Sequence, residues 1–347
     1  MNCCEKLGLN PSETILFYKE YLYPHKESIT DYFERRGYSV NSLDYIDVIL
    51  SKFQETCQNN GKTIIIIEDG GYVVPRVHTG FKALGKQTIG AIEQTTRGVR
   101  NDEEIKELEF PVISVAGSDL KNRFEPLHVA RAVINNIQRL LNENFSSKSA
   151  LVIGYGSIGK EIAIKLKDSL GMNVTISDRD PNKLAGAHQD GFSTANLPDA
   201  VKDKFLVVGA TGETSIGRRE LLAMRHNVHL VSASSDQKEI GITELEALKS
   251  NKEELMCGDK KIGTRYTIRG TESVINLIAD GYPINFWAEE SMPNQVSDLI
   301  MSLILISAIE LAQNYKTIPK EISSDKVNEY SNKYEISRLC LDLYHQM

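Results

Sequence analysis

The stretch VIGYGSIGK, residues 152–160, sets three glycines in the spacing G-x-G-x-x-G. A lone match of this kind is weak evidence for a nucleotide site. Here a run of β-branched residues precedes the glycines and an amphipathic helical pattern follows them. Asp178 then ends the next predicted strand after the expected interval of about 20 residues. This context predicts a Rossmann-type turn that holds a dinucleotide.

Each glycine of the turn has its own physical task. Gly154 permits the tight turn, Gly156 lets a pyrophosphate approach the backbone, and Gly159 lets the following helix pack against the strand. Ser157 and Ile158 open that helix and are predicted to lie at the cofactor, because the helix N-terminus would point toward the anion. The alternative is a glycine turn without a ligand.

Asp178 bears on the identity of the cofactor. A carboxylate at the end of the second strand accepts hydrogen bonds from the adenosine ribose hydroxyls and repels a 2′-phosphate. The residue therefore favours NAD over NADP, although the neighbouring Arg179 reduces that preference.

The order of strand and helix patterns predicts an α/β protein. From residue 147 the two alternate as in a doubly wound parallel sheet. The predicted strands there are 150–154, 173–177, 205–210 and 228–234, and the predicted helices are 157–170 and 217–224. Elsewhere the predicted strands are 62–71 and 111–117, and the predicted helices are 25–37, 126–144 and 294–316.

Composition limits the classes of partner. The chain has 347 residues, 41% of them hydrophobic, and a formal net charge of −7, so it would not attract the phosphates of a nucleic acid. Its longest apolar stretch, Leu299–Leu311, is interrupted by polar residues. Because that stretch is shorter than the roughly 20 residues that a bilayer requires, we expect a core helix and no membrane partner.

The cysteines and the N-terminus indicate the compartment. The start MNCCEKLGLNPSE contains no secretory leader. Five cysteines are scattered without the spacing of zinc ligands. We therefore expect a cytoplasmic protein with free thiols and no metal site.

Several motifs in a fixed order carry a resemblance to a known family. They are EDGGY (68–72), EQTTRGV (93–99), SDLKNRF (118–124), VIGYGSIGK (152–160), SDRDP (177–181), NLIADGYPINF (276–286) and NQVSDLI (294–300). The chain thereby resembles the S-adenosylhomocysteine hydrolase family. That resemblance implies a Rossmann-type doubly wound NAD domain inserted into a discontinuous α/β substrate domain, and a homo-oligomer.

The implied domains follow from the same resemblance. Residues 1–126 would form the first segment of the substrate lobe, and 127–286 the Rossmann domain. Residues 287–347 would contain the return helix, the remainder of the substrate lobe and the tail.

The resemblance also implies chemistry on a ribose. In the family, bound NAD oxidises the 3′-hydroxyl, the ketone acidifies the C4′ proton, the thiol leaves, water adds and the hydride returns. Such chemistry needs a base near the hydroxyl and a further acid or base beside the ketone. The positions that match the family's catalytic residues are Lys121, Asp69, Gln94 and Glu125. The alternative for Lys121 and Glu125 is a solvated ion pair at helical spacing.

Further cofactor positions are carried over from the family. They are Thr95, Thr96, Thr211, Ala233, Ser234 and Asn285. Several follow predicted strands, where ligands bind in open α/β sheets. Each has an alternative as an ordinary turn or strand-end residue.

The sequence departs from the family where the purine and the added water would bind. Ser235 stands where the family has a histidine, and Gln94, which cannot serve as a base, where it has a glutamate. The adenine-binding elements are missing. We therefore expect an NAD-dependent enzyme that oxidises a hydroxyl of a different small molecule, ribose-like or a polyol. The alternatives are a catalytically silent NAD-binding protein and a true S-adenosylhomocysteine hydrolase with rearranged catalytic groups.

Overall fold

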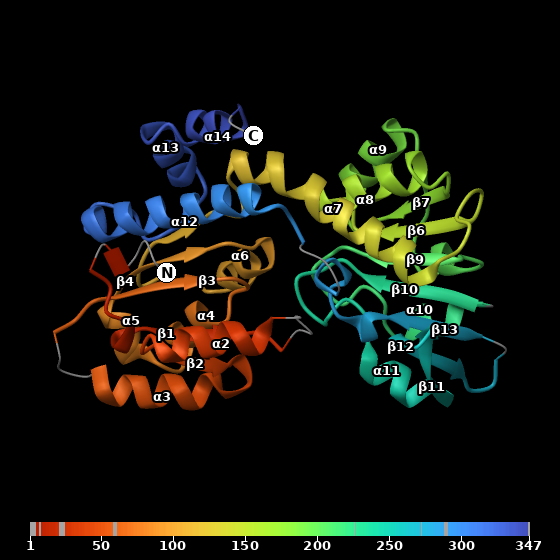
Figure 1. Cartoon of the computed structure of the whole chain (residues 1–347), viewed down its shortest axis with the longest axis horizontal. Helices are drawn as coiled ribbons and strands as arrows, with labels where there is room; N and C mark the ends of the chain where they lie inside the picture. Colours follow the sequence, from red (N-terminus) through yellow and green to blue (C-terminus); the bar gives the residue numbers. More distant parts are fainter. Residues whose placement is uncertain are drawn as a thin grey trace. The chain divides into compact units, whose positions relative to one another are not determined.

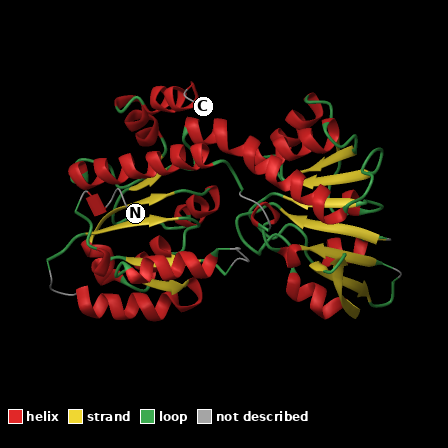
Figure 2. Ribbon diagram, viewed as in Figure 1, coloured by secondary structure: helices red, strands yellow, loops and turns green. Residues whose placement is uncertain are grey.

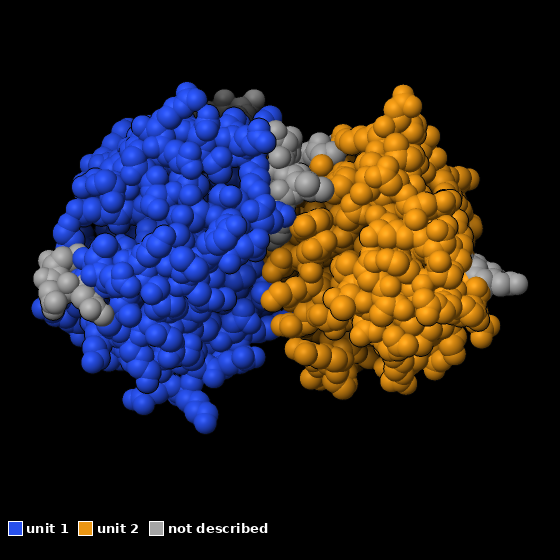
Figure 3. Space-filling model, turned by 90° about the horizontal axis from the view of Figure 1, so that it is seen from below, with its two compact units in different colours: residues 1–123, 294–347 blue, residues 124–293 orange. Residues whose placement is uncertain are grey.

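The computed structural model describes residues 5–6, 8–20, 25–57, 61–225, 227–271, 273–287 and 291–345. The chain divides into two compact units (Figure 3). Unit 1 comprises residues 1–123 and 294–347, and unit 2 comprises residues 124–293. In the sequence, unit 2 is therefore an insertion into unit 1.

Unit 1 contains a four-stranded parallel sheet with the order β14-β5-β4-β3. Its strands are β3 (Ile64–Glu68), β4 (Thr88–Glu93), β5 (Val112–Ser114) and β14 (Ile322–Ser323). Four consecutive isoleucines begin β3, and β-branched side chains of this kind favour extended backbone. A separate parallel pair consists of β1 (Ile15–Tyr18) and β2 (Ser39–Ser42).

Helices surround this sheet. They are α2 (Lys26–Arg35), α3 (Ile46–Cys57), α4 (Val73–Thr79), α5 (Lys82–Gln87), α6 (Thr96–Glu103), α12 (Asn294–Asn314), α13 (Asp325–Lys333) and α14 (Ile336–His345), with 3-10 turns η1 (Pro11–Glu13) and η2 (Leu43–Tyr45). The predicted helix over 25–37 is confirmed as α2, and Gly37 follows it with a φ of +90°. That left-handed conformation suits a glycine after a helix C-terminus.

Helix α12 is long and apolar enough to cross a membrane by length and composition. In unit 1 it runs along the sheet and contacts β3, β4, α13 and α14 (Figure 1). It buries Leu299, Leu303 and Leu311 among other residues. A Cβ on Gly90 of β4 would lie 2.6 Å from Cδ1 of Leu311, so helix and strand pack closely. This is the core helix that the sequence predicts.

Unit 2 contains an eight-stranded sheet, whose strands are yellow in Figure 2. The order of its strands is β11-β12-β13-β10-β9-β6-β7-β8. The strands are β6 (Ser149–Ile153), β7 (Asn173–Ser177), β8 (Ser193–Thr194), β9 (Leu206–Gly209), β10 (Asn227–Ser232), β11 (Lys249–Cys257), β12 (Lys260–Ile268) and β13 (Val274–Ile278). From β8 to β13 all neighbours are parallel. The order reverses between β6 and β9, which is the switch point where open sheets bind ligands.

The helices of unit 2 cover both faces of its sheet. They are α7 (Asp119–Leu141, which begins in unit 1), α8 (Ser157–Asp168), α9 (Pro181–Gln189), α10 (Arg218–Ala223) and α11 (Ile242–Leu248), with 3-10 turns η3 (Asp199–Val201), η4 (Ala279–Gly281) and η5 (Ile284–Phe286). Successive residues of β6 enter different cores, as strand geometry requires. Val152 packs in the core that contains Ile137 of α7, and Leu151 packs in the core that contains Leu221 of α10.

The predicted Rossmann-type doubly wound domain is confirmed by this topology. The sequence did not predict the antiparallel hairpin β11–β12, whose strand β11 is exposed at most positions and lacks a hydrophobic run. Helix α7 also begins earlier than the predicted residue 126, at Asp119, with Pro126 inside it. Proline is normally a helix breaker, so the sequence alone places the start too late.

Candidate functional site

The glycine turn lies between β6 and α8, at the switch point of the sheet in unit 2. Gly154 has a φ of +97°, and a Cβ there would lie 2.7 Å from the carbonyl oxygen of Ala210. A Cβ on Gly159 would lie 1.9 Å from the carbonyl oxygen of Gly154, so strand and helix meet without room for a side chain. A Cβ on Gly156 would meet nothing within 4 Å. Two of the glycines therefore serve packing, and Gly156 leaves open backbone.

The N-terminus of α8 has no side-chain cap. Gly156 is its N-cap and supplies no side-chain hydrogen bond to the first turn. Of the two residues that follow, Ser157 is exposed and Ile158 is half-buried. Uncapped N–H groups and the helix dipole both favour a negative charge at this end.

Asp178 is held at the end of β7 by two backbone donors. Its Oδ2 accepts the N–H of Tyr155 at 2.7 Å, and its Oδ1 accepts the N–H of Asp180 at 2.9 Å. Each carboxylate oxygen retains a lone pair for another donor. The carboxylate is thus oriented in advance, beside the glycine turn, for the ribose hydroxyls that the sequence predicts.

Glu239 joins the ends of β9 and β10. Its carboxylate accepts the N–H groups of Thr211 and Gly212, each at 3.1 Å, and the hydroxyl of Thr211 at 2.8 Å. The hydroxyls of Ser215 and Ser234 also donate to it. Burial raises the pKa of Glu239, and the hydrogen bonds from Ser215, Ser234 and Thr211 act against that rise. The predicted cofactor residues Thr211 and Ser234 thus share one buried acceptor.

The remaining predicted cofactor residues of unit 2 are buried. Ala233 is 5% exposed and donates its N–H to the carbonyl of Gly209 at 2.8 Å. Asn285 donates through Nδ2 to Oγ of Ser291 at 2.8 Å. Its Oδ1 is buried without a hydrogen-bond partner among the described residues. An acceptor of that kind fits a carboxamide N–H, which NAD carries on its nicotinamide.

In unit 1, the predicted substrate residue Asp69 lies directly after β3 and is exposed. Nζ of Lys19 approaches its Oδ1 at 3.4 Å. The side chain of Lys19 is 13% exposed, so the ion pair has one half-buried and one exposed member. Gln94 follows β4, is half-buried and donates its N–H to the carbonyl of Glu68.

Thr95 is the N-cap of α6, and its neighbour Thr96 is exposed. The Thr95 hydroxyl accepts the N–H of Gly98 at 3.0 Å and donates to Oε1 of Glu93 at 2.8 Å. A Ser or Thr cap of this kind stabilises a helix by about 1 kcal/mol. Thr95 is thus fixed in place, and its assignment to substrate or cofactor stays a prediction.

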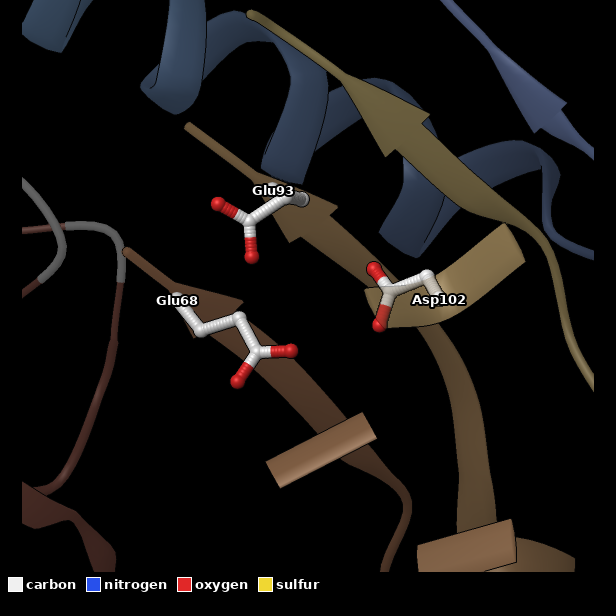
Figure 4. Close-up of side chains that lie close together, drawn as sticks. All are labelled: Glu68, Glu93 and Asp102. Carbon is white, nitrogen blue, oxygen red and sulfur yellow. The ribbon is translucent and has the colours of Figure 1, made fainter. Parts of the chain in front are cut away.

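Glu68, Glu93 and Asp102 form a cluster that the sequence did not predict (Figure 4). One carboxylate oxygen from each lies within 4.8 Å of the others, and all three side chains are buried. At that spacing, two charges repel by about 3 kcal/mol with an effective dielectric of about 20. Burial and then the charge of Glu68 raise the pKa of Glu93 to about 7. Burial and then the charges of Glu68 and Glu93 raise the pKa of Asp102 to about 8.

The predicted catalytic lysine and acid lie on α7. Lys121 is 6% exposed, so the solvated surface pair is excluded for it. Glu125 is half-buried one turn further along the helix. The boundary between the two units falls after Arg123, between these two residues. Their catalytic roles stay predictions.

Sequence reasoning missed Lys19, Glu68, Glu93, Asp102 and Glu239. Two of them carried a local indication, because Glu68 and Glu93 end β-branched strands immediately before the motif residues Asp69 and Gln94. Acids at such positions need donors, since an unpaired buried carboxylate is costly. Asp102 lies in a polar helical stretch that is typical of an exposed helix face. Nothing in the local sequence therefore distinguishes it from an exposed acid.

Comparisons with known proteins show similarity to one family of enzymes. Residues 127–289 match the family described as S-adenosyl-L-homocysteine hydrolase, NAD binding domain. An adenosylhomocysteinase of Thermoplasma volcanium is 30% identical over 263 residues, which are 74% of this chain and 63% of that protein. An adenosylhomocysteinase of Thermotoga maritima is 28% identical over 284 residues, or 80% and 68% of the two chains.

A relative with a different name is equally similar. An S-inosyl-L-homocysteine hydrolase of Methanopyrus kandleri is 30% identical over 270 residues, which are 74% of this chain and 62% of that protein. The chain thus spans less than two thirds of the length of the Thermoplasma and Methanopyrus proteins.

Proposed function

The chain belongs to the S-adenosyl-L-homocysteine hydrolase family, and from that premise we propose that it is an NAD-dependent enzyme that oxidises a hydroxyl group of a ribose-like or polyol substrate. The observation that carries the proposal is the switch-point turn of unit 2, with an open helix N-terminus at Gly156 and a carboxylate fixed beside it at Asp178. In this fold the pyrophosphate of a dinucleotide binds at the helix N-terminus, and its ribose binds the carboxylate at the end of the next strand.

Three groups of the chain fit NAD. The N-terminus of α8 would hold the pyrophosphate, Asp178 the adenosine ribose and Asn285 the nicotinamide amide. Glu239 fixes the backbone after β9 at which a nicotinamide would lie. When bound, NAD supplies an acceptor for a hydride from the substrate carbon.

The chain itself must move the hydroxyl proton. Lys121 is the predicted base, and its side chain is buried. Asp69 is the predicted substrate ligand, since a carboxylate can accept hydrogen bonds from two adjacent hydroxyls. Lys19 balances its charge at 3.4 Å.

The proposed substrate differs from S-adenosylhomocysteine in the base. Relatives of equal identity are named for an adenosyl and an inosyl compound, so similarity at this level does not define the purine. The ribose is common to both names. Gln94 and Ser235 replace the glutamate and histidine expected from the family, and neither can act as a base near neutral pH.

The test is a substrate panel that contains S-adenosylhomocysteine, S-inosylhomocysteine, free nucleosides and polyols. Absorbance of the reduced cofactor reports oxidation, and a thiol reagent reports homocysteine release. We expect lysine-dependent reduction of NAD with at least one ribose compound, lost in Lys121→Ala. Lys316→Ala removes an exposed lysine after α12 and serves as the matched control.

Two outcomes would replace the proposal. Tight NAD binding without hydride exchange on the whole panel would make the chain a silent NAD-binding protein. Homocysteine release from S-adenosylhomocysteine at the rate of the best substrate would make it a hydrolase with rearranged groups. The predicted homo-oligomer is checked separately by sedimentation of the same preparations.

A further inference from the structure

The three carboxyl groups of Glu68, Glu93 and Asp102 come from β3, β4 and α6, and they lie close together (Figure 4). Glu93 and Asp102 are 0% exposed, and Glu68 is 8% exposed. Three charges cannot remain together at this depth without compensation, because each buried charge needs a partner. The compensation must come from donors, a cation or a proton.

Glu68 has its own set of donors. Its Oε2 accepts the N–H groups of Tyr72 at 2.9 Å and Val73 at 2.7 Å, and its Oε1 accepts that of Val74 at 3.2 Å. These are the first N–H groups of α4, which have no partner within the helix. Burial raises the pKa of Glu68, and these N–H groups oppose the rise. The carboxylate thus acts as the cap of α4.

Glu93 also has its own set of donors. Its oxygens accept the N–H groups of Gly71 at 2.9 Å, Gly70 at 3.1 Å and Thr95 at 2.6 Å, besides the Thr95 hydroxyl. A Cβ on Gly98 would lie 2.1 Å from its carboxyl group, so the backbone of α6 closes the remaining side. Glu93 therefore fixes the turn that follows Asp69.

Asp102 has no such donors. Both of its oxygens are buried without a hydrogen-bond partner among the described residues. The charged groups that act on it are Glu68, Glu93 and the exposed Glu103, all negative. The nearby cation Arg97 donates to the hydroxyl of Tyr72 at 2.8 Å.

On α4, His78 uses both ring nitrogens elsewhere. Its Nδ1 bonds the carbonyl of Val74 at 2.7 Å, and its Nε2 accepts the N–H of Glu109 at 3.0 Å. Strands β5 and β14 bring no titratable side chain. Among the described residues, Asp102 therefore has no hydrogen-bond donor that would stabilise its anion.

We propose that Asp102 is a neutral carboxylic acid at physiological pH, that it donates its proton to the glutamate pair, and that it thereby positions the Gly70–Gly71 turn beside Asp69. The link to Asp69 rests on the proposed function, whereas the proton site does not. Asp102 is a positioning residue, since it acts through Glu93 and the turn.

A metal ion fits the cluster less well than a proton. The oxygens of Glu68 and Glu93 already accept six N–H groups, three each, which leaves few lone pairs for coordination. A divalent cation would also lie close to those N–H groups, whose hydrogens repel it. A proton on Asp102 needs only one free lone pair.

The proposal predicts a direction for the dependence on pH. The pKa of Asp102 is raised in the folded state to about 8, so the folded protein binds this proton more tightly than the unfolded chain. The resulting stability is complete below the unfolded value of 3.8 and is lost as pH rises through about 8. Glu93 adds a change of the same sign through about 7.

The experiment compares wild type with three variants. Asp102→Asn keeps an N–H donor and mimics the neutral acid, Asp102→Leu removes it, and Glu103→Gln deletes an exposed charge one residue away. Urea unfolding gives the free energy of unfolding at each pH between 5 and 8. Its dependence on pH gives the difference in the number of bound protons between the folded and unfolded states. Infrared spectra in heavy water report the carbonyl band of a protonated carboxyl group.

We expect the free energy of unfolding to change with pH equally in wild type and Glu103→Gln. In Asp102→Asn the change should be smaller, by the amount that corresponds to about one bound proton. The infrared band should be present at pH 6, weaker at pH 9, and reduced in Asp102→Asn. In wild type, KM should rise above pH 8, where Asp102 ionises. Asp102→Asn should have the wild-type KM at pH 7 and should not show that rise. Asp102→Leu should unfold at lower urea.

Two results would overturn the proposal. One is that Asp102→Asn shows the same pH dependence of unfolding and the same infrared carbonyl band as wild type. The other is one equivalent of Mg²⁺, Mn²⁺ or Ca²⁺ in the purified wild type, with its loss in Asp102→Asn, which would assign the site to a metal. If the Asp102 variants fail to fold, the infrared band of wild type and Glu103→Gln can still be followed between pH 6 and pH 9. Its absence at pH 6 would contradict a protonated carboxyl group. Because infrared and unfolding need no substrate, an inactive protein would leave this inference testable.

Discussion

The backbone N–H of Tyr155 donates to Oδ2 of Asp178 at 2.7 Å, which ties the glycine turn to the end of the next strand. The contact joins residues from β6–α8 and β7, the two segments that surround an adenosine in this fold. Asp178 is therefore in position before any ligand arrives, which reduces the ordering that binding must supply.

Asp178→Asn should weaken NAD binding about tenfold, or about 1.4 kcal/mol, because a charged acceptor for the ribose hydroxyls is lost. Binding of NADP should improve relative to NAD, since the repulsion of its 2′-phosphate disappears. Fluorescence titration with both cofactors measures the ratio. Asp180→Asn is the control, because Asn also caps the helix that Asp180 begins. An unchanged ratio would show that Asp178 does not face the ribose.

Gly159→Ala and Gly156→Ala should separate packing from binding. The new Cβ at 159 would lie 1.9 Å from a carbonyl oxygen, so strand and helix must move apart and the free energy of unfolding should fall by roughly 2–4 kcal/mol. The new Cβ at 156 meets open space, so stability should stay within about 0.5 kcal/mol of wild type. NAD affinity should nevertheless fall, because the methyl group obstructs the pyrophosphate. Calorimetry and cofactor titration of both variants check the pair.

Glu239→Gln should lower both stability and NAD affinity. The amide can accept at one atom only, so some of the donors from Thr211, Gly212 and Ser234 would face an N–H₂ group. Leaving buried donors unpaired costs about 1–3 kcal/mol. Glu244→Gln removes a partly exposed ion pair with Arg218 and should change unfolding by less than about 1 kcal/mol. Equal effects of the two changes would contradict a special role for Glu239.

His229→Phe should make unit 2 less sensitive to acid. Burial, above all, lowers the pKa of His229 to about 4, and neither ring nitrogen has a hydrogen-bond partner among the described residues. A folded-state pKa below the unfolded 6.5 gives stability that is present above pH 6.5 and lost as pH falls through about 4. The contribution is about 3 kcal/mol at most. Phe packs against Phe205 as the imidazole does and cannot titrate. Unfolding in urea at pH 7 and pH 4.5 should show a smaller loss in the variant than in wild type.

Much of unit 2 could be predicted from local pattern. Strands β6, β7, β9 and β10 are short, largely apolar runs separated by amphipathic helices, and each run can be recognised within its own segment. The hairpin β11–β12 could not, because most side chains of β11 are exposed and its sequence has no apolar run. Its stability comes from pairing, which composition does not record.

The glycine turn and the resemblance to the family could be predicted from residue order, since glycine spacing, a preceding strand and a following helix lie within one contiguous segment. The cluster of Glu68, Glu93 and Asp102 depends instead on where two strands and a helix end in space. Each acid reads as an ordinary charged residue in its own segment. Burial, shared donors and mutual repulsion exist only after folding has brought the segments together, and these give Asp102 a chemistry that no local pattern carries.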